Sequence, residues 1–288
     1  MKILNFGSIN KDFVYLVENF VQSGQTISSK KYEVFLGGKG LNQSVALSHS
    51  GANIYHAGCI NKNDDPIIIQ LNKWGVNTDN IIKVEDPTGH AIIQVNDQGE
   101  NSIIIHGGAN HTISSEQIEN TLNKFNSGDI LVLQNEINKI DEVINRGYEI
   151  GMKIFLNPAP FTKEIINYPL EKLDTLIFNE SEGCGLSSGE KDKTKILKYL
   201  SNKYPNTKLL LTLGKKGSVY SYNNNKAIEI PANKVNSIDT TAAGDTYIGY
   251  FISSYYKNNK VKESMEIASK AASISTTKMG GAISIPKL

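Results

Sequence analysis

The second half of the chain alternates regularly between strand-like and helix-like segments, and this alternation restricts the fold more than any other feature. Short apolar runs typical of buried strands are separated by stretches whose apolar residues recur three and four apart, as in helices. Strands that alternate with helices at this spacing pair in parallel, so we predict an α/β fold with a mostly parallel sheet covered by helices on both faces. The predicted helices are 114–125, 138–150, 190–203, 242–256 and 261–278, and the predicted strands are 129–133, 153–156, 175–178, 208–212, 217–222 and 226–230, the last two joined by a polar turn at 223–225.

The first part of the chain mixes this pattern with a second one. Strands at 3–6 and 53–58, and helices after residue 40 and at 66–74, continue the α/β pattern. Residues 11–36 and the runs 83–84, 91–95 and 102–105 have the pattern of short strands without intervening helices, and we expect them to pair in a small separate sheet. The predicted division is 1–10, 38–82 and 107–288 for the main domain, and 11–37 and 83–106 for the small sheet.

The charge balance excludes several classes of partner. Thirty basic and 29 acidic residues leave a net charge of +1 without a basic run, so nucleic acid and anionic membranes are poor candidates. No apolar run is long enough to cross a membrane, and the first apolar residues are too few for a signal peptide. Two cysteines without a paired spacing fit a reducing compartment, so we expect a cytoplasmic protein. Arg146 is the only arginine, so phosphate chemistry must rely on lysine, metal and backbone amides.

The segment Asp239–Thr246 combines small residues with a carboxylate at a predicted helix start. Ala242, Ala243 and Gly244 let the backbone approach a ligand, and the unpaired N–H groups of a helix N-terminus attract an anion. A carboxylate beside such an anion hole suits a general base, which takes a hydroxyl proton while the amides hold developing phosphate charge, and Asp245 is the candidate. An acid at a helix start is also common without a catalytic role, and this segment alone leaves the two interpretations about equal.

Gly37–Gly40 resembles a phosphate loop but lacks the spacing of a Walker A motif. The glycines can instead form a hinge whose backbone, at Gly38, lies against a small ligand, with Lys39 beside it. Asn42, one turn into the next helix, can add a hydrogen bond. A flexible loop with a surface lysine is the simpler interpretation, and by itself the motif favours it.

Three polar residues follow predicted strands near the start and middle of the chain. Asn10 and Asp12 lie two residues apart on an extended segment, so their side chains point to the same side, where they can bind vicinal hydroxyls of a sugar. Glu136 follows the strand 129–133, at the end where parallel sheets bind their ligands. Ordinary turn residues after a strand are the alternative.

Two further segments could serve a nucleotide. Asn179 and Glu182 lie three apart at a helix start, where Asn179 could contact phosphate and Glu182 could order metal-bound water; a helix cap explains this spacing equally well. Thr212, Gly214 and Gly217 follow the next strand, and their glycines would let a nucleotide lie against the backbone. A plain hairpin turn has equal weight.

Taken in order along the chain, these segments resemble the signature of the ribokinase-like (pfkB) carbohydrate kinases. The resemblance covers nearly the whole chain and rests on the order of its motifs. The matching segments are Gly7–Asn10 with Asp12, Gly37–Gln43, Thr88–Gly89, Glu100–Asn101, His106–Asn110, Glu136, Asn157–Pro160, Asn179–Glu182, Thr212–Gly214 and Asp239–Thr246.

The resemblance implies ATP-dependent, Mg²⁺-assisted transfer of a phosphoryl group to the primary hydroxyl of D-ribose, with Asp245 as the base and an anion hole at residues 242–245. It also implies activation by K⁺, a small sheet that closes as a lid, and a homodimer formed through that lid. The implied ligand positions are Asn10, Asp12, Gly38, Lys39, Asn42 and Glu136 for the pentose; Asn179, Thr212, Gly214 and Gly217 for the nucleotide; Glu182 for Mg²⁺ through water; and Asp239, Thr241 and Ser284 for the monovalent cation.

The chain departs from the family pattern at two places and leaves alternatives open. The segment Asn63–Ile68 lacks both glycines of the family's Gly-Asp-Asp-x-x-Gly motif, and Ser269 stands where a residue flanking adenine is expected. Within the same reaction class, the substrate could be deoxyribose, fructose or a nucleoside. A sugar-binding regulator that has lost catalysis is the alternative from another class.

Overall fold

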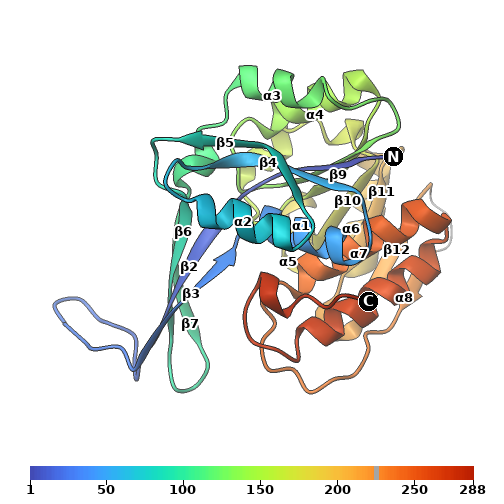
Figure 1. The fold of residues 1–288 in the computed structure, drawn as a ribbon. Coiled ribbons are helices and arrows are strands. Elements are labelled where there is room, and N and C mark those ends of the chain that lie inside the picture. The colour runs from blue at the N-terminus through green and yellow to red at the C-terminus, as the bar shows by residue number, and fades with distance from the viewer. Residues whose placement is uncertain (224–226) are drawn as a thin grey trace.

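The computed structural model describes residues 1–223 and 227–288 and contains one large and one small β-sheet (Figure 1). Within these residues the large sheet has the strand order β13-β12-β11-β10-β9-β8-β1-β4-β5. The strands from β11 to β5 are parallel, and β12 and β13 add an antiparallel edge. Their bounds are β1 Ile3–Phe6, β4 Ile54–Asn61, β5 Asn77–Val84, β8 Ile130–Gln134, β9 Lys153–Asn157, β10 Thr175–Asn179, β11 Lys208–Thr212, β12 Ser218–Ser221 and β13 Ile228–Ile230.

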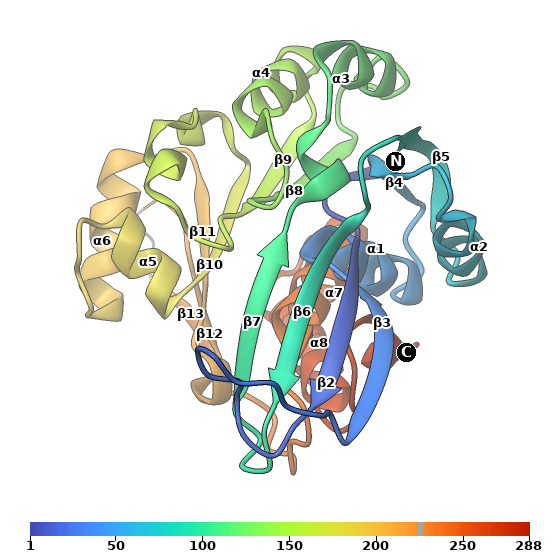
Figure 2. The ribbon, with the colours of Figure 1, turned by 90° about the vertical axis from the view of Figure 1, so that its left-hand side faces the viewer.

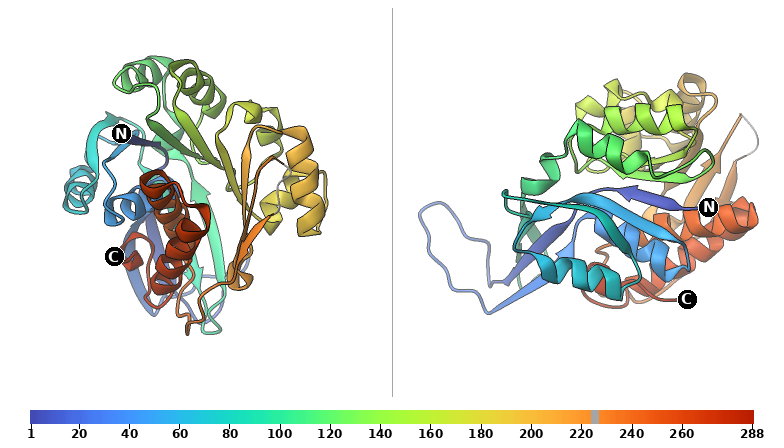
Figure 3. Two further views of the ribbon diagram at one scale, coloured as in Figure 1. Left: turned by 90° about the vertical axis from the view of Figure 1, so that its right-hand side faces the viewer. Right: turned by 45° about the horizontal axis from the view of Figure 1, so that its top comes forward.

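Helices cover both faces of the large sheet, which confirms the predicted fold class (Figure 3). Successive strand residues pack into opposite layers: Ile3 contacts one helical layer and Leu4 the other. Among the described helices, none is long and apolar enough to cross a membrane. One layer contains α1 Lys39–His49, α2 Asp65–Lys73, α7 Ala243–Asn258 and α8 Val261–Ser275, and the other contains α3 Ser115–Leu122, α4 Ile140–Ile150, α5 Glu180–Leu186 and α6 Lys193–Lys203.

Short 3₁₀ helices lie in the connections between these elements. Their bounds are η1 Gly108–His111, η2 Lys163–Asn167, η3 Leu170–Lys172, η4 Gly214–Lys216 and η5 Ala282–Ser284. The predicted hairpin at 217–222 and 226–230 is present as β12 and β13. Residues 224–226, which include part of its predicted polar turn and the first residue of its second strand, lie outside the described residues.

The small sheet stands beside the ends of the large one, with the strand order β3-β2-β6-β7 (Figure 2). Its strands are β2 Asn10–Leu16, β3 Lys31–Gly37, β6 Gly89–Val95 and β7 Asn101–His106. The expectation that Lys83 and Val84 pair within it is wrong: they end β5, which pairs with β4 in the large sheet. An edge strand pairs with a single neighbour and buries less of its surface than a central strand. Residues 77–82 of β5 therefore lack the regular apolar pattern of a buried strand. The domain boundaries that we drew stay a prediction.

Helices α1 and α7 approach each other closely. A Cβ atom on Gly249 of α7 would lie 2.5 Å from the Cβ of Ala46 of α1, so only glycine allows this packing distance. One turn before Gly249, α7 carries Asp245, and one turn before Ala46, α1 carries Asn42 and Gln43. The close helix contact therefore brings the first turns of α1 and α7 together.

Candidate active site

A cavity of about 210 Å³ lies where β9, β10 and β11 end and α1 and α7 begin. This is the edge at which open parallel sheets bind ligands. Several residues that the sequence singles out line this cavity together, although they come from distant parts of the chain. They are Lys39, Asn179, Glu182, Thr212, Ala242, Gly244 and Asp245.

Asp245 occupies the first turn of α7 and is 8% exposed. Its Oδ2 accepts a hydrogen bond from Asn42 Nδ2 at 3.0 Å, and its Oδ1 accepts one from Gln43 Nε2 at 3.0 Å. Ala242, just before the helix, has a left-handed backbone with φ of 58°. A Cβ atom on Gly244 would meet no atom within 4 Å, so the cavity reaches the backbone at the helix start. The N–H of Ala243 donates to the carbonyl of Thr240 at 3.2 Å, whereas no acceptor among the described residues is bonded to the N–H groups of Gly244 and Asp245. These two N–H groups lie at the same helix start as the carboxylate.

Lys39 brings a positive charge among three carboxylates. Burial lowers its pKa, but the negative charges of Asp245, Glu136 and Glu182 outweigh burial and raise the pKa above its usual value. Lys39 therefore keeps its charge in the site. This excludes the interpretation of a surface lysine in a flexible loop, because Lys39 lines the cavity at the start of α1.

Glu136, after β8, is fixed by two donors. Its Oε2 accepts hydrogen bonds from Ser8 Oγ at 2.5 Å and from the backbone N–H of Lys39 at 2.9 Å. Burial raises its pKa, while the charge of Lys39 and the hydrogen bond from Ser8 act in the opposite direction. Glu136 thus ties the end of β8 to the loop before α1. Ser8 had no role in our sequence interpretation, although it lies in the matching segment Gly7–Asn10.

Asp12 and Asn10 lie on the side of β2 that faces Glu136. Burial, and then the charge of Glu136, raise the pKa of Asp12 to about 6. A Cβ atom on Gly37 would lie 2.1 Å from Asp12 Oδ2, so the carboxylate rests on the backbone of β3. Within the described residues no donor is hydrogen-bonded to this carboxylate, whereas Asn10 Oδ1 accepts a bond of 2.8 Å from Asn110. The Asp12 carboxylate is available to a hydroxyl-bearing ligand.

Gly38 closes the other side of this group. It has φ of 89°, a conformation that L side chains rarely adopt, and a Cβ atom there would lie 3.1 Å from the backbone N of Asn10. Asn42 combines the hydrogen bond to Asp245 with a buried Oδ1 that has no partner among the described residues. A buried acceptor of this kind normally finds a donor, and a ligand hydroxyl could supply it.

Asn179 and Glu182 form a capping box at the start of α5. Asn179 Oδ1 accepts from Glu182 N at 2.9 Å, and Glu182 Oε2 accepts from Asn179 N at 3.0 Å. The capping interpretation is therefore correct, yet both residues also line the cavity. Burial raises the pKa of Glu182, opposed by the Asn179 backbone and by Lys39. A single carboxylate facing a polar cavity suits Mg²⁺, which keeps several of its waters.

The segment after β11 was interpreted either as a nucleotide contact or as a plain hairpin turn, and its two glycines fit different interpretations. Thr212 lines the cavity, whereas Gly214 and Gly217 do not. A Cβ atom on Gly217 would lie 2.0 Å from the carbonyl oxygen of Ile230, so this glycine is needed for the packing of a turn. Gly214 has φ of 55° and open space around its Cβ position, so its backbone is accessible beside Thr212.

The three residues assigned to a monovalent cation lie outside the cavity lining. Asp239 Oδ1 accepts from Thr241 Oγ1 at 2.6 Å, and Asp239 Oδ2 accepts from Gly280 N at 2.9 Å. Ser284 Oγ donates to the carbonyl of Gly281 at 2.8 Å, which places it on the segment that Asp239 holds. Within the described residues no cluster of three acidic, histidine or cysteine ligands exists. Asp239 and Thr241 therefore lie together with the segment that carries Ser284, and their role as cation ligands stays a prediction.

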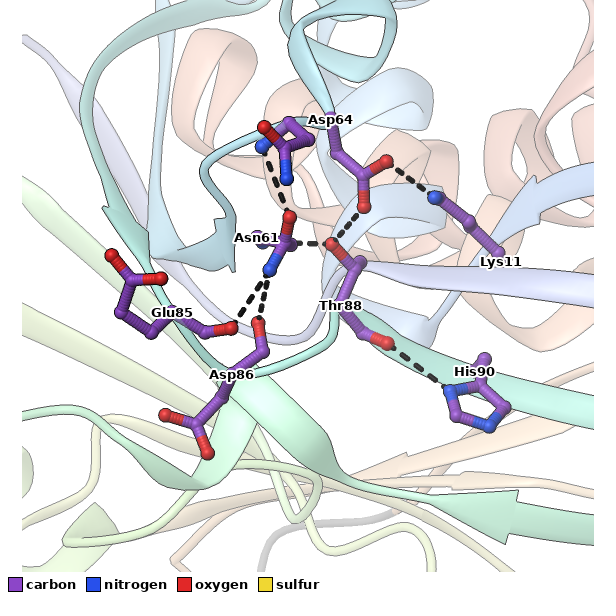
Figure 4. A network of polar contacts seen from close by, with 8 residues as sticks. Lys11, Asn61, Asp64, Glu85, Asp86, Thr88 and His90 are labelled. Carbon is purple, nitrogen blue, oxygen red and sulfur yellow. Dashed lines mark hydrogen bonds and ion pairs between the residues drawn. The ribbon is translucent and has the colours of Figure 1, made fainter.

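A second, larger hollow of about 450 Å³ is lined by Lys11, Asn61, Asp64 and Thr88, among others. Figure 4 shows the polar contacts between these residues. Lys11 forms an ion pair with Asp64, and Thr88 Oγ1 donates to Asp64 Oδ2 at 2.5 Å. Thr88 Oγ1 in turn accepts from the backbone N–H of Asn61 at 2.8 Å. These polar groups bind one another and tie the small sheet to the end of β4. Asp64 belongs to the segment in which the chain departs from the family motif.

Sequence reasoning assigned no role to three residues at the site. Gln43 contacts Asp245, and Asn157 and Thr240 line the cavity. All three lie in or beside the matching motifs, and Gln43 and Thr240 are next to assigned residues, which is the only signal that the sequence offers for them. Arg146 pairs with Glu119 on the surface of α3 and α4, outside the cavity lining.

Comparisons with known proteins agree with this geometry. The model of the pfkB family carbohydrate kinases matches residues 1–288. A ribokinase of Staphylococcus aureus (strain COL) is 34% identical, with 100% of this chain and 97% of that protein covered. A deoxyribokinase of Salmonella typhi is 29% identical, with 100% and 96% covered. The structure of Arabidopsis thaliana ribokinase complexed with ribose and ATP is similar with a TM-score of 0.85 at 28% identity, covering 99% of this chain and 95% of that one. Fold, cavity and sequence together show that the chain belongs to the pfkB family of carbohydrate kinases.

Proposed function

We propose that this kinase transfers the γ-phosphoryl group of ATP to the primary, 5-hydroxyl group of D-ribose and forms ribose 5-phosphate. The position of Asp245 carries the proposal. This carboxylate lies at the N-terminus of α7, with both oxygens held by amides, in the cavity that also contains Lys39 and Gly244. The ribokinase name of the relative that is 34% identical over the whole chain supports ribose as the acceptor.

In the proposed mechanism Asp245 accepts the proton of the sugar hydroxyl as its oxygen attacks the γ-phosphorus in line. The backbone N–H groups of residues 242–245 stabilise the charge on the transferred group, which can approach because the space at Gly244 is open. Lys39 adds positive charge from the opposite side of the cavity. Closure of the small sheet over the sugar would exclude water and limit ATP hydrolysis.

The sugar would be bound by residues that converge beside the cavity. Asp12 and Asn10 would accept and donate hydrogen bonds to vicinal hydroxyls, since the Asp12 carboxylate has no bonded donor among the described residues. The unpartnered Oδ1 of Asn42 would accept a further hydroxyl. Glu136, Lys39 and the backbone of Gly38 complete the proposed sugar site.

The nucleotide and the cations would bind on the side of β10 and β11. We propose that Asn179, Thr212 and Gly214 contact the nucleotide and that Glu182 holds Mg²⁺ through water. Mg²⁺ would neutralise charge on the phosphates when bound. Potassium would bind at Asp239, Thr241 and Ser284, close to the start of α7, and would support the anion hole electrostatically.

A homodimer through the small sheet is part of the proposal. The sheet exposes an unusual number of large apolar side chains, and β7 is an edge strand with three consecutive isoleucines. Exposed apolar surface of this kind usually marks a protein interface. The exposed residues are Tyr32, Val34, Ile92, Ile103, Ile104 and Ile105.

ADP release tests the reaction and its substrate. The purified protein is supplied with ATP, Mg²⁺ and ribose, 2-deoxyribose, fructose or a nucleoside, in K⁺ and in Na⁺. We expect the highest kcat/KM with ribose and faster turnover in K⁺. Asp245→Ala should lower kcat by about 10²–10⁴-fold, the usual contribution of a positioned base, while ribose still binds in calorimetry. Near-normal turnover of this variant would refute the assigned base, and no ADP release with any acceptor would favour a sugar-binding regulator.

Deoxyribose is the second candidate substrate, because a deoxyribokinase is 29% identical over the whole chain. The two sugars differ in one hydroxyl, and Asp12 with Asn10 is the polar pair that can bind vicinal hydroxyls. A site built to bind a hydroxyl discriminates strongly against a ligand that lacks it. If kcat/KM is higher for 2-deoxyribose than for ribose, 2-deoxyribose becomes the proposed substrate.

A further inference from the structure

Three neighbouring strands of the large sheet each place one polar side chain on the apolar face beneath α1. They are Asn5 of β1, His56 of β4 and Gln134 of β8, and all three are 0% exposed. Asn5 and His56 are directly paired in the parallel register. Polar groups in such a position are costly unless they are hydrogen-bonded, and apolar residues would fill this layer without that cost. Their presence calls for a reason.

The first branch of this network leads to the proposed base. Gln134 Nε2 donates to Gln43 Oε1 at 2.7 Å, and Gln43 Nε2 donates to Asp245 Oδ1 at 3.0 Å. Because Gln43 Oε1 is held by Gln134, its amide group must turn Nε2 toward the carboxylate. Gln43 is 0% exposed, so it cannot touch a substrate.

The second branch anchors Gln134 from the other side. Gln134 Nε2 also donates to Asn5 Oδ1 at 2.9 Å, and Asn5 Nδ2 donates to Ser44 Oγ at 3.0 Å. Ser44 Oγ lies 2.7 Å from His56 Nδ1. Burial lowers the pKa of His56 to about 4, so the ring is neutral near pH 7, and Nδ1 can accept the hydrogen of Ser44. Asn5 and Ser44 therefore link Gln134 to the ring of His56.

The side-chain nitrogen of Gln134 donates two hydrogen bonds, whereas its side-chain oxygen accepts none among the described residues. Gln134 Oε1 is buried without a hydrogen-bond partner among the described residues. A Cβ atom on Gly7 would lie 2.3 Å from this oxygen, so the glycine makes room for it. An unsatisfied buried acceptor destabilises the fold. The arrangement is unfavourable for stability alone, which indicates a role in orienting Gln43.

We propose that Gln43 and Gln134 are positioning residues that fix the rotation of the Asp245 carboxylate and favour its ionised form. The inference rests on the proposed role of Asp245 as the base. The groups that face Asp245 are the amides of Asn42 and Gln43 and the charges of Lys39, Glu136 and Glu182. Asn42 also belongs to the proposed sugar site, so Gln43 is the donor that serves the carboxylate alone.

The test compares Gln43→Leu and Gln134→Met with Gln117→Leu. Gln117 is a matched control: it is 8% exposed and donates to the carbonyl of Gly58 at 3.0 Å, but it lies on α3, in the other helical layer. For each folded variant, kcat and KM for ribose and the pH dependence of kcat/KM are measured. Circular dichroism and thermal unfolding establish that the variants are folded.

We expect Gln43→Leu to lower kcat by about tenfold or more, with KM for ribose changed less than threefold, because a charged hydrogen bond is lost where no substrate binds. The acid limb of kcat/KM should move to higher pH, because the ionised carboxylate loses a hydrogen-bond donor. Gln134→Met removes the hydrogen bond that holds Gln43 and so acts on Asp245 only indirectly. It should lower kcat and shift the acid limb in the same directions, by smaller amounts. Gln117→Leu should leave kcat and the acid limb unchanged even if it lowers the Tm.

The outcomes separate this inference from the proposed function. If Asp245→Ala is inactive and folded Gln43→Leu keeps the wild-type kcat and acid limb, the positioning role is wrong while the base assignment stands. If Asp245→Ala is active, the base assignment itself fails. Should Gln43→Leu not fold, Gln134→Met decides, and a wild-type pH profile in that variant overturns the inference. An acid-limb shift of equal size in Gln117→Leu would also overturn it.

Discussion

The two hollows described above differ in a way that size does not reveal. The larger, about 450 Å³, is lined by Lys11, Asp64 and Thr88, whose polar groups are bound to one another. The smaller, about 210 Å³, contains Asp245 and Lys39, with a backbone at Gly244 that faces open space. Groups with unused bonding capacity, and not volume, mark the place where a substrate can bind.

Strand β2 lines the larger hollow with Lys11 and contributes Asp12 to the proposed sugar site. Lys11 and Asp12 are neighbours on β2, so their side chains point to opposite faces of the small sheet. Lys11 is paired with Asp64, whereas Asp12 has a raised pKa and no bonded donor among the described residues. If the comparison is correct, changes on the Asp12 side should affect activity, and changes on the Lys11 side should affect stability.

Gly244→Ala should have the largest effect. The added methyl group meets no atom within 4 Å, so the protein should fold as before, with Tm equal or higher because alanine favours helix. The methyl group would project into the space of the transferred phosphoryl group, and we expect kcat to fall by about 100-fold or more, as for other small misplacements of reacting groups. ADP release and thermal unfolding measure the two effects.

Gly249→Ala, five residues further along α7, is the control for Gly244→Ala. Its methyl group would lie 2.5 Å from Ala46 Cβ, so the helices must separate and the free energy of unfolding should fall by about 1–3 kcal/mol. A Gly244→Ala variant that is destabilised like Gly249→Ala, or that keeps wild-type kcat, would contradict the open space at the start of α7.

Asp12→Asn should have the next largest effect, which we expect on the binding of ribose. Loss of the charged acceptor should raise KM for ribose by about 10- to 100-fold, because hydrogen bonds to charged groups contribute about 1.5–3 kcal/mol. Lys11→Met, on the opposite face of the same strand, should change KM by less than about threefold. Steady-state kinetics with both variants checks the prediction, and equal effects on KM would remove the distinction between the two faces.

Asp12 should also make stability depend on pH. Its folded pKa of about 6 lies above the ordinary value of 3.8, so the unfolded chain gives up this proton more readily than the folded protein. The ionised carboxylate therefore opposes folding: the free energy of unfolding should decline between about pH 4 and pH 6 and stay lower above that range. Asp12→Asn should be more stable than wild type by about 1–2 kcal/mol at pH 7.5 and equal to it at pH 4, as measured by denaturant unfolding. Equal stability at both pH values would argue against a strained carboxylate.

Thr88→Val should have the smallest effect on catalysis. It removes the hydroxyl that donates to Asp64 and accepts from the Asn61 backbone, and we expect a loss of about 1–2 kcal/mol in the free energy of unfolding. The value of kcat should stay within about twofold of wild type, because the larger hollow takes no part in the chemistry. A loss of kcat comparable to that of Gly244→Ala would show that the larger hollow is functional.

Much of the fold was predictable because its periodicities are long and regular. The α/β alternation after residue 114 predicts the strands and most helices of that half, including α7 and α8, whereas α5 was expected only as a helix start at Asn179 and Glu182. The edge strand β5 was not predicted as a whole, because its residues 77–80 are mostly polar and only one neighbour, β4, pairs with them. Lys83 and Val84 were assigned to the wrong sheet for the same reason: pairing partners are not encoded in a single strand.

Part of the candidate site could be predicted from the sequence, because the parallel strands of a sheet all end at the same edge. Glu136 follows β8, and Asn179 and Thr212 are the last residues of β10 and β11, so their position at one edge of the sheet could be expected from topology alone. Gly217 shows the limit of this reasoning, since its requirement for glycine comes from the carbonyl of Ile230 and not from a ligand. Asn179 and Glu182 satisfy both a helix cap and the cavity, so neither interpretation excluded the other.

The sequence by itself determined the order of the strands and helices, the family motifs and the carboxylate at the start of α7, because these depend on local periodicity and residue type. Tertiary structure alone decided which groups surround that carboxylate. Gln43 and Asp245 are 202 residues apart, and they meet only because Gly249 lets α7 pack closely against α1. Likewise, Asn5, His56 and Gln134 look like isolated polar residues in apolar strands until the sheet register aligns them beneath one helix. Hydrogen-bond networks of this kind form between surfaces, and a surface exists only once the chain has folded.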